Sequence, residues 1–112
     1  MDFNQRMLDV ASGYMKDLQG RIDKLTEKNL EDMAISEILD LILYATEFIR
    51  YASIVRYIVE DPADNYGYDV KALDDSILEY AQVLGAAQHY RFALLEQKLG
   101  VLSIGSWVKK SY

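Results

Sequence analysis

Residues 41–62 read LILYATEFIRYASIVRYIVEDP, and this stretch decides the fold that the rest of the chain must build. Up to Val59 its charged residues are Glu47, Arg50 and Arg56, so a helix formed from it is apolar on most of its circumference. The same three charges argue against a membrane-spanning segment. Two neighbouring helices of one small chain can cover about two faces of such a helix. We therefore expect the remaining face to be covered by the C-terminal tail or by another subunit.

The central helix is predicted to begin before this stretch, because apolar residues already recur from Leu30 onward. Asn29 is typical of a residue that caps a helix N-terminus. Asp32 lies three positions inside the helix, in a pattern that resembles a capping box. The sequence therefore predicts a second helix over about residues 30–60.

Two further segments have apolar residues at every third or fourth position, residues 3–28 and residues 70–99. Gly100 stands where a left-handed C-cap would end the later of these two helices. The inward stripe of that third helix is expected to comprise Leu73, Ile77, Tyr80 or Ala81, Leu84, Gln88, Phe92, Leu95 and Leu99. The chain is therefore predicted to be a single all-α domain over residues 1–112. Its expected architecture is an antiparallel bundle of three long helices, followed by a short irregular tail over residues 100–112.

The charge of the chain is concentrated in one segment. The 112 residues carry a net charge of −6, and residues 60–79 hold seven acidic residues against one basic residue, Lys71. An acidic middle argues against a nucleic-acid-binding surface, which needs a basic face. It favours a partner protein with a basic surface, which an acidic segment would attract over a distance.

Residue types that are absent limit the location and the chemistry. The chain has no cysteine, so it has neither a disulfide framework nor a thiolate metal site. The first ten residues, MDFNQRMLDV, lack the basic and apolar regions of a signal peptide. These features lead us to expect a cytoplasmic protein that is not embedded in a membrane.

The acidic connection between the second and third predicted helices contains helix-capping residues and two tyrosines. Asp61 before Pro62 is typical of a helix start, and Asp69 is a plausible cap for the third helix. Capping does not account for Tyr66 and Tyr68, two aromatic residues in an exposed connection. One interpretation is that Tyr66 and Tyr68, with the nearby Asp64 and Asp69, bind a partner. The other is that the rings dock onto the bundle of the same chain.

A second candidate surface lies on the central helix. Arg50 and Tyr57 are seven positions apart and therefore share one helical face. Ordinary amphipathic packing would bury the aromatic body and leave the hydroxyl and the guanidinium in water. The alternative is an Arg–Tyr surface that binds a partner.

The third candidate surface is the C-terminal tail, GVLSIGSWVKKSY, which contains Trp107 and is not helix-periodic. The tail either folds back over the central helix or serves as an arm that binds a partner or another subunit.

The sequence carries few residues suited to catalysis. It has no cysteine nucleophile, and His89 is its only histidine, so we expect no catalytic residue, no metal site and no cofactor. One alternative stays open, because Glu37, Asp40 and Glu47 place carboxylates on one side of the central helix. Such carboxylates are suited to a Mg²⁺-dependent enzyme that acts on nucleotides.

These observations favour a non-enzymatic protein that binds other proteins. We expect a small acidic helical module that docks on a partner, as an inhibitor, an immunity or antitoxin-like protein, or an assembly adaptor does. The alternatives are the carboxylate–metal enzyme and a self-associating structural subunit. The apolar central helix favours a homo-oligomer in either non-enzymatic case.

Overall fold

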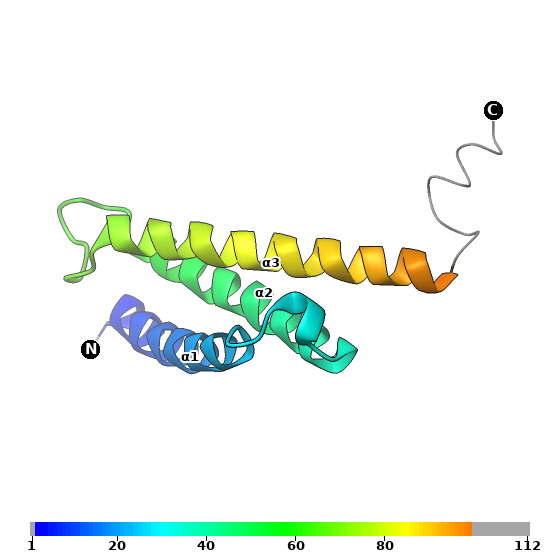
Figure 1. The fold of residues 1–112 in the computed structure, drawn as a ribbon. Helices are drawn as coiled ribbons and strands as arrows, with labels where there is room; N and C mark the ends of the chain where they lie inside the picture. The colour runs from blue at the N-terminus through cyan, green and yellow to red at the C-terminus, as the bar shows by residue number, and fades with distance from the viewer. Residues whose placement is uncertain (1, 100–112) are drawn as a thin grey trace, which may run out of the picture.

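A computed structural model of the chain describes residues 2–99, which fold into three long helices (Figure 1). Helix α1 spans Phe3–Leu25, a single 3₁₀ turn spans Leu30–Asp32, α2 spans Ile35–Ile58 and α3 spans Val70–Leu99. Residues 2–99 contain no strand. The predicted all-α bundle of three antiparallel helices is therefore confirmed, whereas Gly100 and the tail lie outside the described residues.

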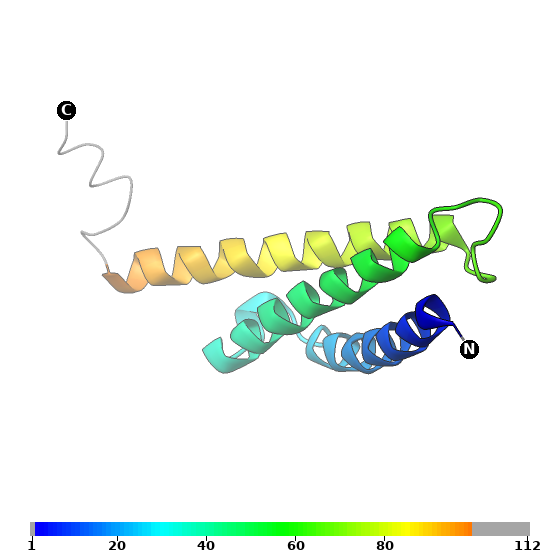
Figure 2. The same ribbon diagram turned by 180° about the vertical axis from the view of Figure 1, so that it is seen from behind.

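Helix α2 lies between the other two helices and packs against both of them (Figure 2). Its buried side chains form the centre of the core and comprise Ile38, Leu41, Ala45, Phe48, Ala52 and Val55. The helix has another face that neither neighbour covers, where Ile35, Leu39, Leu43 and Tyr57 are exposed. This arrangement agrees with the expectation that two helices of the same chain would leave part of the apolar central helix open.

An aromatic pair joins α2 to α3 in the core. The ring of Phe48 lies against that of Tyr80, with 4.2 Å between the ring centroids, and both side chains are buried. Burial raises the pKa of the Tyr80 hydroxyl, and the nearby carboxylates of Asp23 and Glu79 raise it further. Because Asp23 belongs to α1, Tyr80 reaches across from α3 towards both of the other helices.

The start of α2 differs from the prediction. The helix begins at Ile35 rather than near residue 30, because the backbone at Met33 is extended and carries its side chain into the core. Asn29 makes no side-chain capping bond, so its predicted role as the cap of α2 is wrong. The Glu37 carboxylate accepts the backbone N–H of Ala34 over 2.9 Å instead.

The start of α3 agrees with the prediction. The carboxylate of Asp69 accepts the backbone N–H of Ala72 over 3.1 Å, and the helix begins at Val70. Asp61 accepts the N–H of Ala63 over 2.9 Å in the preceding turn. These two aspartates therefore have local structural roles at the end of the molecule where α2 turns into α3.

Candidate functional site

The loop between α2 and α3, residues 59–69, is fixed by a tight turn. Tyr66 has φ of 55° and Gly67 has φ of 79°, so both lie in the left-handed region. Asn65 holds the turn, because its side chain accepts the N–H of Gly67 and its carbonyl accepts the N–H of Tyr68, each over 3.0 Å. A left-handed conformation costs a non-glycine residue about 1–2 kcal/mol. The contacts of the Tyr66 ring and the bonds to Asn65 offset that cost.

Both loop tyrosines pack against the bundle. Each side chain is half-buried and touches the core. The Tyr66 hydroxyl lies 3.5 Å from the amide nitrogen of Asn4, and the Tyr68 hydroxyl is paired with that of Ser12. The structure therefore shows the ring docking that was one of the two interpretations, and it joins the loop to the first half of α1. Whether the exposed parts of these rings bind a partner stays a prediction.

Seven acidic residues lie in the loop and in the first ten residues of α3. All seven acidic residues of positions 60–79 are exposed. Asp74 is paired with Arg56 across α2 and α3, with 2.7 Å between the guanidinium and the carboxylate. Among residues 2–99, no ion pair involves Glu60, Asp64, Asp75 or Glu79. We call this region the acidic end, residues 60–79.

The structure places Arg50 and Tyr57 on the uncovered face of α2. Both side chains are exposed, and that of Tyr57 is 80% exposed. Leu43, a further seven positions before Arg50, is exposed on the same stripe. Arg50 and Tyr57 belong to α2, outside the loop that carries Tyr66, so the predicted partner-binding residues fall on two different surfaces. The predicted contact through Trp107 lies outside the described residues.

The carboxylates of the alternative metal site do not gather in the described part of the chain. Glu37 accepts the N–H of Ala34 and also pairs with Lys28 over 3.0 Å, and these two contacts lower its pKa. Residues 2–99 contain no group of three or more histidine or acidic side chains placed to hold a metal ion. Glu37 therefore acts as a cap for α2.

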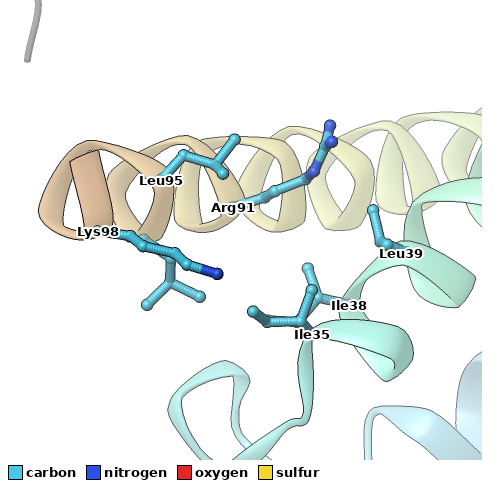
Figure 3. A pocket seen from close by; sticks show the side chains of 7 residues that line it. Ile35, Ile38, Leu39, Arg91, Leu95 and Lys98 are labelled. Atoms are coloured by element: carbon cyan, nitrogen blue, oxygen red, sulfur yellow. The ribbon is translucent and has the colours of Figure 1, made fainter. Parts of the chain in front are cut away.

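A groove between α2 and α3 was not predicted. It lies between the first half of α2 and the second half of α3 (Figure 3). We call it the α2–α3 groove and define it by Ile35, Ile38 and Leu39 from α2 with Arg91, Leu95 and Lys98 from α3. A second hollow lies beside it and includes Ile42 and Phe92.

The groove was not predicted because the residues of α3 that point inward differ from the expected ones. Ala87 is buried and Leu94 packs against the core, whereas Gln88, Phe92 and Leu95, which were expected to point inward, are exposed. The prediction used steps of four residues too often, and such steps rotate slowly around a helix of 3.6 residues per turn. Phe92 and Leu95 consequently line an open surface instead of filling the core.

None of the helices that the structure describes combines the length and the apolar character needed to cross a bilayer. A comparison with known proteins found no family model, no curated protein and no solved structure that matches the chain.

Proposed function

We propose that this chain is a protein-binding module that docks through its acidic end on a partner protein with a basic surface. The observation that carries the proposal is the exposure of all seven carboxylates of residues 60–79, four of which lie in the loop between α2 and α3. Such a concentration of one sign of charge attracts a basic partner and increases the rate of productive encounters.

The loop is also suited to bind without a large loss of conformational entropy. The bonds to Asn65 fix the backbone at Tyr66 and Tyr68, and the contacts with α1 fix the two rings. A partner would meet side chains that are already ordered, so less free energy is lost on binding. The exposed parts of the two rings supply apolar contact next to the charges.

The test compares two triple variants that change the net charge equally. The first replaces Asp64, Asp75 and Glu79 with Asn, Asn and Gln, which removes three charges that cap no helix in the structure. The matched control removes three exposed charges around the α1–α2 connection by Glu27→Gln, Glu31→Gln and Asp32→Asn. Each immobilised protein is used to capture a partner from a native cell extract, and association with the purified partner is then timed.

We expect the wild type and the control to capture the same partner and the acidic-end variant to associate about tenfold more slowly. Association of the wild type should also slow as the salt concentration passes about 0.1 M, where the screening length is roughly 10 Å. Equal binding by the two triple variants, with no dependence on salt, would place the interface elsewhere.

The uncovered face of α2 supports self-association as a second candidate function. Leu43, Arg50 and Tyr57 repeat every seven residues along an exposed stripe, so they share one helical face that a second helix can contact. Light scattering should then give a dimer at micromolar concentration, and Leu43→Ser with Tyr57→Ser should give a monomer. The control is Val10→Ser, at an exposed residue of α1. A monomeric wild type would count against this candidate.

A further inference from the structure

The α2–α3 groove is an apolar surface that no described segment covers. Ile35, Leu39 and Leu95 are 57%, 41% and 43% exposed, while Ile38 is buried at the base of the groove. Figure 3 shows the side chain of Lys98 extending from α3 towards α2. Its aliphatic stem adds to the apolar lining, since lysine side chains lie along apolar surfaces with the charge in water. An apolar segment that binds here would remove this exposed apolar surface from water, which is favourable.

The chain itself continues from the edge of this groove. Lys98 lines the groove, and α3 ends at the next residue, Leu99. Thirteen residues, 100–112, follow in the sequence. Fully extended, they would reach about 43 Å, whereas the part of α2 from Ile35 to Ile42 rises about 10 Å. The segment is therefore long enough to reverse its direction and to run along the whole groove.

The composition of this segment matches the groove. Five of the eight residues 101–108 are apolar and large, namely Val101, Leu102, Ile104, Trp107 and Val108. Residues 101–108 carry no charge, and the basic pair Lys109 and Lys110 follows directly. Because Arg91 and Lys98 stand at the edge of the groove, like charges disfavour the entry of that basic pair. The apolar residues before it meet no such repulsion.

We propose that residues 101–108 of the same chain bind in the α2–α3 groove as an intramolecular strap. A tethered segment reaches an effective concentration of about millimolar at a site within its reach. A second copy of the chain, present at micromolar concentration, competes poorly for the same surface. The strap covers Leu39 and Leu95 and shields Trp107 from water.

Trp107 is the only tryptophan of the chain, so its fluorescence reports directly on the strap. In the full-length wild type we expect blue-shifted emission and weak quenching by iodide. Leu39→Asp and Leu95→Asp place a charge in the groove, so each should move the emission to that of a solvent-exposed tryptophan. The control is Leu78→Asp, because Leu78 is an exposed residue of α3 outside the groove. It should leave the emission unchanged.

Circular dichroism shows whether each variant keeps its helices, and Leu95→Ser serves as a milder groove variant if an aspartate unfolds the chain. Tryptophan emission that is already solvent-exposed in the wild type, or that responds equally to Leu78→Asp, overturns the proposal. Dilution separates a strap from a second copy. Shielding of Trp107 that stays constant over a hundredfold dilution supports the intramolecular strap, and shielding that is lost on dilution overturns it in favour of exchange between two copies.

Discussion

The three phenylalanines of the chain give a graded test of the packing, because they are buried to very different extents. Phe48 is 2% exposed, Phe92 is 47% exposed and Phe3 is 74% exposed. Phe48→Ala removes a fully buried ring that lies against Tyr80, and such changes cost about 3–5 kcal/mol because a cavity remains. Phe3 has about a quarter of its surface buried, so Phe3→Ala should cost only about 0.4–0.8 kcal/mol. Phe92→Ala should cost about 1 kcal/mol on the same scale.

The assay is urea unfolding followed by helical circular dichroism. With a slope of about 2 kcal/mol per molar urea, Phe48→Ala should lower the midpoint by about 2 M, and Phe3→Ala by less than about 0.5 M. Phe48→Leu, which leaves a smaller cavity, should fall between them. The reasoning would be refuted if Phe48→Ala cost no more than Phe3→Ala with an unchanged slope. A cost for Phe92→Ala far above about 1 kcal/mol would indicate that the strap covers its ring.

Three further predictions follow from single contacts. Asp69→Ala should lower the free energy of unfolding by about 1 kcal/mol in a urea titration, because it removes the cap of α3. Asp64 caps no helix in the structure, so Asp64→Ala should leave the free energy of unfolding unchanged. Gly67→Ala should destabilise the protein by about 1 kcal/mol or more because φ is positive at that position. Gly85→Ala should stabilise it by about 0.5–1 kcal/mol, since this helical position has room for a methyl group, and thermal unfolding should show a lower midpoint for the first variant and a higher one for the second. The pKa of Glu37 is lowered on folding. The contribution of Glu37 to stability is therefore present above the pKa of a glutamate in the unfolded chain, about 4.3, and is lost as the pH falls through the lower pKa of the folded state. The difference in unfolding midpoint between the wild type and Glu37→Gln should shrink on acidification.

Periodicity was sufficient to predict the number and order of the helices. The bounds of α3 and its cap at Asp69 agree with the prediction, because a capping aspartate before a long apolar stripe leaves few alternatives. The start of α2 could not be predicted in the same way. Leu30 and Met33 fit a helical stripe, but Met33 enters the core from an extended backbone, which depends on the position of the neighbouring helix.

The α2–α3 groove could not be predicted from the sequence for a similar reason. Leu94 and Leu95 are both leucine, and only the rotation of α3 against α2 decides which of them packs against the core. That rotation depends on Tyr80 and on the rest of the interface, so it is a tertiary property. The positions of the loop tyrosines also depend on distant residues, because Asn4 and Ser12 of α1 contact their hydroxyls.

The central position of α2 has a consequence for how the molecule opens. Since α1 and α3 both pack mainly against α2, either outer helix can detach while the other hairpin keeps its core. Amide protons in the middle of α2 then exchange with solvent only through global unfolding. Those of α1 and α3 exchange through partial openings that need less free energy. The two contacts from the loop tyrosines to Asn4 and Ser12 raise the cost of opening at the start of α1. Native-state hydrogen exchange should therefore be slower for the amides in the middle of α2 than for those of α1 and α3.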